Sequence, residues 1–155
     1  KTAEMGFIIA QLELGYLYNE GKEIAQDYKE AFKWYRMAAE EGDSWAQVEL
    51  GYLYRDGHGI EQNDHEAVKW YLRATEQGDE SVAVNLGEHY AAGEGVEKDN
   101  IQAYKWFSVA VINGDEDSQK YKQTLEEEMT PIQVAEAQEL ARKWIEKWKR
   151  KPKPI

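Results

Sequence analysis

The side chains that most often carry catalysis or bind metals are few in this sequence and follow no known catalytic spacing. Cysteine is absent, which removes thiol catalysis, disulfides and thiolate metal sites together. The three histidines, His58, His65 and His89, do not match a zinc motif such as H-E-x-x-H. No serine lies in G-x-S-x-G or begins S-x-x-K, the contexts in which serine acts as a nucleophile. We therefore expect no enzyme activity, no metal and no cofactor.

Carboxylates are numerous, with 30 Asp and Glu against 19 Lys and Arg and a net charge of −11. Most of them fall at helix starts and on outer helix faces, so a catalytic carboxylate pair has no specific support. An acidic surface repels nucleic acid, whose phosphates need Lys and Arg, and favours a neutral or cationic partner. We therefore predict that the partner is not a nucleic acid.

The C-terminal end has the opposite charge. From Arg142 onward, seven Lys and Arg stand against Glu146 alone, and residues 150–155 form a basic tail. Cations at this position complement the carbonyl end of a helix, and docking to a membrane surface or a nucleic acid is the alternative. No run approaches the ~18 apolar residues of a membrane span, and no signal peptide is visible, so we predict no membrane insertion.

The elements that would position any site come from an internal repeat of 36 residues. A Leu-Gly pair, a tyrosine, a tryptophan and a turn glycine recur in phase. They are Leu14 and Gly15, Leu50 and Gly51, Leu86 and Gly87; Tyr18, Tyr54 and Tyr90; Trp34, Trp70 and Trp106; and Gly42, Gly78 and Gly114. The sequence therefore predicts three repeats, at 8–43, 44–79 and 80–115, within a single domain spanning residues 1–155.

Each repeat reads as two helices. The second helix begins after Asp27, Asn63 or Asp99, each followed three residues later by Glu or Gln, which is a reciprocal capping box. The turn glycine ends that helix, and the Asp or Ser that follows caps the next one. A glycine in the middle of the first helix costs about 1 kcal/mol relative to alanine, so we expect the large tryptophan of the second helix to pack against it.

The edges of the repeat array also carry signals. Residues 1–7 match the end of a second helix one period later, so we expect them to close a preceding repeat and further repeats to lie before Lys1. Residues 116–129 are expected to form a partial fourth repeat. A capping helix is expected at 130–149, starting at Thr130 and Pro131, with an apolar face that includes Ile132, Ala137, Ala141 and Trp144.

These residues carry a recognisable pattern, A-x-x-x-L-G-x-x-Y-x-x-G-x-G-[IV]-x-x-[DN]-x-x-x-A-x-x-W-[YF]-x-x-A-x-x-x-G, met from Ala46 to Gly78. The pattern resembles the SEL-one-like repeat family, a relative of the tetratricopeptide repeats. The resemblance implies an all-α, right-handed α/α solenoid that serves as a non-catalytic adaptor for protein complexes. Because many members are bacterial and exported, it favours an exported or periplasmic location, which the residues themselves do not specify.

In such repeats the first helices line a concave binding face. Carried over by repeat position, this face comprises Ile9, Leu12, Tyr16, Asn19 and Glu20 in the first repeat, Trp45, Val48, Tyr52, Arg55 and Asp56 in the second, and Ser81, Val84, Glu88, Ala91 and Ala92 in the third. We expect a monomer that binds a peptide or a partner protein there, with Trp45 and Tyr52 as anchors. Two alternatives stay open: several of these residues only pack against neighbouring helices, or the aromatic rings stack on sugars in a cell-envelope module.

Overall fold

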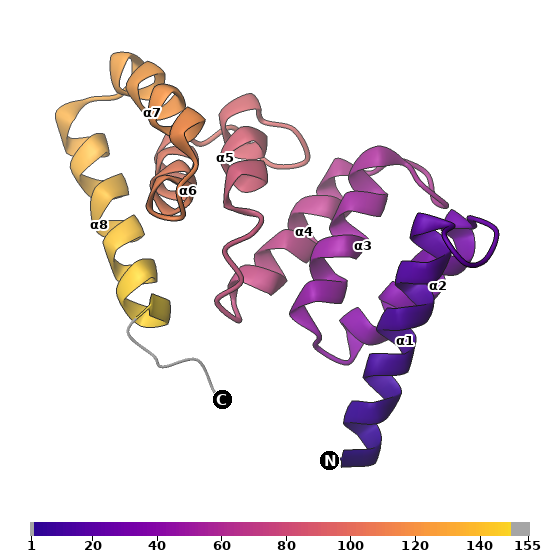
Figure 1. The fold of residues 1–155 in the computed structure, drawn as a ribbon. Coiled ribbons are helices and arrows are strands. Elements are labelled where there is room, and N and C mark those ends of the chain that lie inside the picture. Colours follow the sequence, from indigo (N-terminus) through magenta and orange to yellow (C-terminus); the bar gives the residue numbers. More distant parts are fainter. Residues whose placement is uncertain (1, 150–155) are drawn as a thin grey trace. The chain divides into compact units, whose positions relative to one another are not determined.

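The computed structural model of the chain describes residues 2–149, with side chains from Met5 onward, so the basic tail at 150–155 lies outside the described residues. The described residues form eight helices: α1 (Thr2–Glu20), α2 (Tyr28–Glu40), α3 (Ser44–Asp56), α4 (Asp64–Thr75), α5 (Ala83–Ala92), α6 (Asn100–Ile112), α7 (Glu116–Glu128) and α8 (Pro131–Lys149) (Figure 1). No strand occurs among them. The predicted all-α fold of helix pairs is therefore confirmed.

The chain divides into two compact units, Lys1–Asp79 and Glu80–Ile155, and each is described by itself. Unit 1 contains α1 to α4, which are the helix pairs of the first two repeats. Unit 2 contains the third helix pair together with α7 and α8. The boundary falls where the second predicted repeat ends, while the expectation of a single domain stays a prediction.

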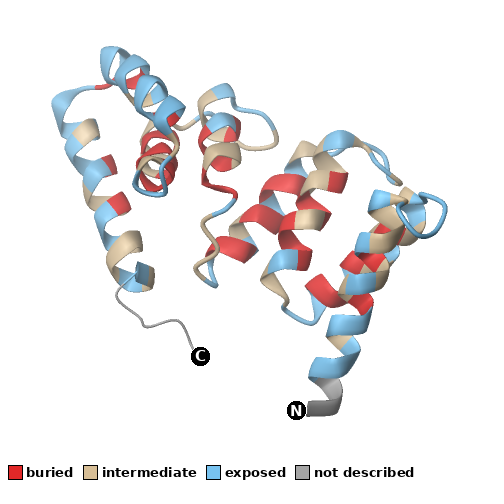
Figure 2. Cartoon of the chain, in the orientation of Figure 1, coloured by how far each residue is buried: buried red, intermediate tan, exposed pale blue. Residues whose placement is uncertain are grey.

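Inside each unit, neighbouring helices pack through the small and aromatic positions of the repeat. In unit 1, α1 contacts α2, α2 contacts α3 and α3 contacts α4; in unit 2, α6 contacts α5, α7 and α8. Buried residues lie along the inner faces of these helices, as Figure 2 shows. Ala31, Ala38, Ala67, Ala74 and Ala103 are all inaccessible to solvent, so the repeated alanines allow close packing of the helices.

The second helices begin at the predicted caps, but the capping box is only half formed. The carboxylate of Asp27 accepts hydrogen bonds from the backbone N–H groups of Lys29 and Glu30 at 2.9 and 3.2 Å. The N–H of Asp27 donates to the carbonyl of Tyr18 at 2.9 Å, and so cannot serve the Glu30 side chain. Asn63 and Asp99 bond the carbonyls of Tyr54 and Tyr90 in the same way, at 2.8 and 2.9 Å. The repeated cap thus ties the second helix to the end of the first.

The structure differs from the expectation that residues 1–7 close a preceding helix at Gly6. The equivalent glycine of the next repeat, Gly42, has φ of +97° and is followed by Asp43, whose carboxylate accepts from the N–H of Ala46 at 2.8 Å. Gly6 is followed by Phe7, which cannot cap a new helix, and α1 runs through it without a break. A glycine alone therefore does not end a helix here, because a cap for the next one must follow.

Two further helix starts differ from one another. Thr130 and Gln133 form a complete capping box, in which the N–H of Thr130 donates to the side chain of Gln133 at 2.9 Å and the N–H of Gln133 donates to the Thr130 hydroxyl at 3.3 Å. The first helix of the third repeat starts only at Ala83, after Val82, whose side chain makes no capping bond. The sequence expectation of an acidic cap directly after Gly78 was therefore wrong for α5.

The capping helix α8 packs against α6, with the rings of Trp106 and Trp144 edge to face at 5.7 Å. Ala137 and Ala141 are buried in this contact region of unit 2, as predicted. Ile132 is not part of the contact, since its side chain is 80% exposed. Ile132 lies in the first turn of α8, and the buried residues of this helix begin only further along, at Ala137.

The mid-helix glycines are explained by close contact, but with a different aromatic residue from the one expected. A Cβ at Gly15, Gly51 or Gly87 would lie less than 3.0 Å from ring carbons of Tyr35, Tyr71 and Phe107, respectively, which is too close for a real Cβ. The tryptophan one residue earlier was predicted to fill this role, and that prediction was wrong. Adjacent residues point about 100° apart around a helix, so only one of the pair can face the glycine.

We predict that Gly51→Ala destabilises the protein by about 1–3 kcal/mol, because the new methyl group overlaps the Tyr71 ring in a packed core. Urea unfolding followed by circular dichroism measures this change. The matched control is Gly6→Ala, where nothing lies within 4 Å of the added carbon and helix propensity favours alanine by up to about 1 kcal/mol. Equal stabilities for the two variants would contradict the packing role of Gly51.

Candidate functional site

The ring of Tyr35 lies between the two first helices of unit 1. It contacts the backbone of α1 at Gly15, and it packs edge to face against the indole of Trp45 on α3, with ring centres 5.7 Å apart. The side chain is fully buried, and its hydroxyl has no hydrogen-bond partner among the described residues. Tyr35 therefore forms a floor between α1 and α3, with an unsatisfied polar group at its end.

Carboxylates from both first helices act on this hydroxyl. Burial raises the pKa of the Tyr35 hydroxyl, and the charges of Glu49 on α3 and Glu20 on α1 raise it further. Tyr16, also on α1, contributes in the same direction. The hydroxyl thus faces an acidic environment made by the predicted residues Tyr16 and Glu20 together with Glu49, which the sequence reading did not select.

Glu49 is half-buried, and no hydrogen bond or ion pair of its carboxylate occurs within the described part of the chain. Burial raises the pKa of the Glu49 carboxyl, and the nearby Glu20 carboxylate raises it further. A carboxylate that loses water without gaining a cation or a donor is costly. The site therefore holds negative charge that the chain does not neutralise.

One cation of the chain already binds at the edge of this site. The ammonium of Lys22 lies 3.1 Å from the Tyr16 hydroxyl and 3.0 Å from the Glu20 carboxylate. It also lies over the Tyr16 ring, 5.5 Å from its centre. This arrangement is exposed to solvent, so the ion pair itself contributes little stability.

The other predicted anchor, Tyr52, has its ring covered. The guanidinium of Arg55 lies 5.0 Å from the ring centre, and Tyr71 packs against the ring edge to face at 5.7 Å. Arg55 in turn makes two hydrogen bonds to Asp56, of 2.7 and 3.0 Å, which hold the pKa of the Asp56 carboxyl below its usual value. These three predicted residues form one polar cluster at the end of α3, in which the charges are paired.

Unit 2 has a cavity of about 380 Å³ at the corresponding repeat positions. Phe107, which occupies the position of Tyr35, lies beneath it, and the Tyr121 ring of α7 stacks on Phe107 at 5.0 Å. The remaining lining residues come mainly from the first-helix positions: Glu88, Ala91 and Ala92 on α5, and Thr124, Leu125 and Glu128 on α7. In unit 2, α5 and α7 therefore line a cavity whose wall also includes Phe107 of α6.

The structure separates the predicted binding residues into three groups. Exposed at or near the face are Tyr16 and Trp45, 40% and 41% exposed, together with Ile9, Glu20, Asp56, Ser81, Glu88 and Ala92. Partly buried are Leu12, Asn19, Tyr52, Arg55, Val84 and Ala91. Val48 is buried, with only 4% exposed, so packing rather than binding explains it.

Four residues of the face were missed by the sequence reading: Tyr35, Glu49, Tyr121 and Thr124. Glu49 stands four residues after Trp45 and three before Tyr52, a spacing that places all three on one side of a helix. Tyr121 and Thr124 are one period after Asn85 and Glu88, but Lys122 and Gln123 replace the Leu-Gly pair and hide the register. Only the structure shows that Tyr35 reaches between the first helices.

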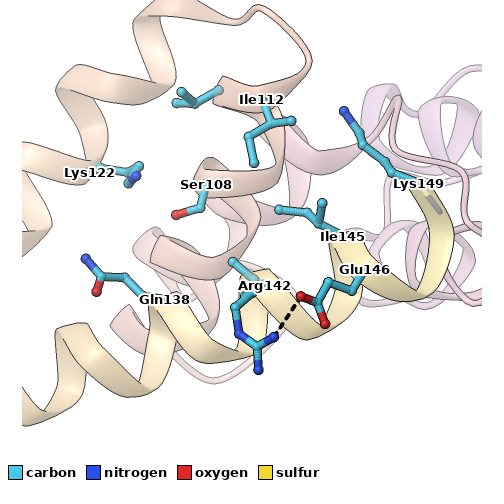
Figure 3. A pocket seen from close by; sticks show the side chains of 10 residues that line it. Ser108, Ile112, Lys122, Gln138, Arg142, Ile145, Glu146 and Lys149 are labelled. Atoms are coloured by element: carbon cyan, nitrogen blue, oxygen red, sulfur yellow. Dashed lines mark ion pairs between the residues drawn. The ribbon is translucent and has the colours of Figure 1, made fainter.

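A second cavity in unit 2, of about 520 Å³, lies between α6, α7 and α8, which diverge around it (Figure 3). Its apolar wall includes Ile112 and Ile145. The charged residues at its rim are engaged within the chain: Arg142 pairs with Glu146 at 2.8 Å, and Lys149 donates to the Asn113 side chain at 2.7 Å. Because these charged groups already have partners, they are less available to bind a ligand than the Tyr35 hydroxyl and the Glu49 carboxylate of unit 1.

Within the described residues, no group of three or more His, Asp or Glu is arranged to hold a metal ion. His89 is buried, with Nδ1 2.9 Å from the carbonyl oxygen of Glu94, and His58 stacks on Tyr28 with ring centres 4.3 Å apart. None of the described helices is both long and apolar enough to cross a membrane.

We predict that Tyr35→Phe leaves the free energy of unfolding unchanged or raises it by up to about 1 kcal/mol, because it removes a buried hydroxyl without a partner. Tyr104→Phe is the control, since the Tyr104 hydroxyl donates to Glu126 at 2.7 Å and its loss should cost about 1 kcal/mol. Chemical denaturation of both variants tests this, and an equal loss in the two would show that the Tyr35 hydroxyl is satisfied.

We also predict that Glu49→Gln stabilises the protein at pH 7 but not at acidic pH. The pKa of the Glu49 carboxyl is raised in the folded state, so ionisation costs stability as pH rises above the usual glutamate value. Below that value both states are protonated, and the difference vanishes. Unfolding curves at pH 7 and at about pH 4 measure it, with Glu13→Gln, exposed at the same repeat position, as the control. Equal stabilisation at both pH values would contradict the assignment to charge.

Comparison with known proteins gives matches in sequence and in structure. The Sel1 repeat family matches residues 8–43, 46–79 and 81–115. A solved structure of c5321, described as a protective antigen of uropathogenic Escherichia coli with an SLR fold, is similar with a TM-score of 0.79 and 32% identity. The match covers 99% of this chain and 35% of that one. No curated protein matches the chain.

Two further solved structures are similar. A Sel1 repeat protein from Oxalobacter formigenes has a TM-score of 0.72 and 30% identity, over 90% of this chain and 58% of that one. Cysteine-rich protein B of Helicobacter pylori has a TM-score of 0.60 and 24% identity, over 77% and 92%, and shares the fold. This chain thus spans about a third and somewhat over half of the first two relatives. Because one family matches most of the chain in three consecutive stretches, the chain belongs to the Sel1 repeat family.

Proposed function

We propose that this repeat protein is a non-catalytic scaffold that holds an extended segment of a partner protein on the first-helix face. One observation carries the proposal: the repeat position of Glu88 and Thr124, which line a cavity in unit 2, holds Tyr52 and Tyr16 in unit 1, and the Tyr16 side chain is 40% exposed. A surface that repeats along successive helices suits a ligand that is itself extended.

The chemistry of this face supports a peptide as ligand. Tyr16 and Trp45 offer partly exposed rings, and the Trp45 ring is already held against Tyr35, so its ordering on binding costs little conformational entropy. Carboxylates and amides beside them can bond the polar groups of a peptide backbone. The Tyr52 ring is covered by the Arg55 guanidinium, so it is not open for the face-to-face stacking that sugars need.

We predict that the double variant Trp45→Ala, Tyr52→Ala binds at least about tenfold more weakly to partner peptides, a loss of about 1.4 kcal/mol or more. Random 12-residue peptides displayed on phage provide the probes, and fluorescence anisotropy of the recovered sequences gives Kd. Circular dichroism checks that the variant is folded.

Ile132→Ala is the matched control, because it removes an 80% exposed apolar side chain of α8 that is not one of the first-helix residues of the proposed face. Its Kd should equal that of the wild type. Peptides that bind the double variant as tightly as the wild type would place recognition elsewhere on the chain.

A further inference from the structure

The Tyr35 hydroxyl is not required by the packing of the repeat. Phe107 occupies the same repeat position in the third repeat and lies on Gly87 as closely as Tyr35 lies on Gly15. The ring alone therefore fulfils the structural role. The hydroxyl of Tyr35 adds only a buried polar group without a partner among the described residues, and burying such a group costs stability.

The Glu49 carboxylate is likewise not explained by the fold. The same position holds the exposed Glu13 in the first repeat, Asn85 in the third and Tyr121 in the partial repeat. Glu49 alone among the carboxylates at this position is half-buried, beside the negative charge of Glu20. Burial of like charges is unfavourable unless a cation arrives to share them.

The surrounding groups are complementary to one kind of side chain. An anion would be repelled by Glu20 and Glu49, and an apolar group would leave the Glu49 carboxylate and the Tyr35 hydroxyl without partners. A protonated amine or guanidinium donates several N–H bonds and binds over aromatic faces such as those of Tyr16 and Trp45. Lys22 already shows this mode at the edge of the site, with its ammonium on the Tyr16 hydroxyl and the Glu20 carboxylate.

We infer that the first-helix face of unit 1 selects basic segments of a partner protein by seating one lysine or arginine side chain between Glu20 and Glu49, over the Tyr35 hydroxyl. This inference rests on the proposed scaffold function and adds the chemistry of the ligand. The Tyr35 oxygen accepts a hydrogen bond from the cation, and Glu49 becomes the buried half of an ion pair. The net charge of −11 steers such a segment toward the face.

Binding has a defined pH dependence under this arrangement. The pKa of the Glu49 carboxyl is raised in the free protein, and an arriving cation lowers it by favouring the ionised form. Affinity therefore falls as the solution becomes acidic and Glu49 takes up a proton. An apolar contact at the same place would remove water from Glu49 and favour its protonated form, so its affinity would rise as the solution becomes acidic.

The test uses synthetic, fluorescein-labelled versions of the phage-displayed 12-residue peptides that depend on Trp45 and Tyr52. Each lysine is replaced by norleucine and each arginine by citrulline, and Kd is measured by anisotropy against wild type, Glu49→Gln and Glu76→Gln. Glu76 is exposed at the end of α4 and controls for the loss of one negative charge.

We expect one basic residue of the peptide to matter most. Its replacement should weaken binding of the peptide to the wild type and to Glu76→Gln about tenfold or more. Glu49→Gln should weaken the parent peptide to a similar degree, and replacing the basic residue should then cost little more, since the two groups act as a pair. Tyr35→Phe, which keeps the packing, should weaken the parent peptide severalfold.

Two other outcomes overturn the inference in distinguishable ways. Peptides that need Trp45 and Tyr52 but bind unchanged after every basic residue is neutralised would refute basic selection and leave the scaffold function standing. Failure to recover any peptide that depends on Trp45 and Tyr52 would refute the scaffold function at this face as well.

Discussion

The contact between a glycine of each first helix and an aromatic ring of the second helix determines the rest of the structure. Because the glycine has no Cβ, the ring lies directly on the backbone of the neighbouring helix, as Tyr35 does on Gly15. This contact fixes the distance between the paired helices. It also carries the far end of the ring through to the first-helix face, so the residue that packs the repeat is the one that supplies the floor of the candidate site.

The candidate site lowers the stability of unit 1, as a comparison of equivalent positions in the repeats indicates. Phe107 packs without a hydroxyl, and position 85 holds a neutral asparagine, whereas unit 1 keeps an unsatisfied Tyr35 hydroxyl and a desolvated Glu49. Unsatisfied polar groups of this kind lower stability and are commonly retained where function needs them. The packing positions of the repeat thus hold the helices together, and the repeats differ in the polar groups that they place at and beside these positions.

Hydrogen bonds at the helix caps explain why the frame is so regular. The N-cap residue of each second helix accepts from the first turn of that helix and donates its own N–H to the carbonyl of the repeat tyrosine. One residue thereby fixes both the start of a helix and its position against the preceding helix. A tyrosine carbonyl, an Asp or Asn cap and a turn glycine therefore recur with the same spacing. The first-helix positions of Trp45, Tyr52 and Glu88 hold different residue types from one repeat to the next.

The sequence by itself determined the period, the helix pairs, the N-cap residues of the second helices and the turn glycines between repeats, because each depends on residues close together in the chain. Carry-over of repeat positions also selected Tyr16, Trp45 and Glu88, whose side chains are exposed on the first helices. The sequence did not determine that Tyr35 rather than Trp34 meets the glycine, that Val48 is buried, that Ile132 is exposed, or that Glu49 loses its water. These features depend on which side chains from other helices surround a residue, and only the tertiary packing decides that.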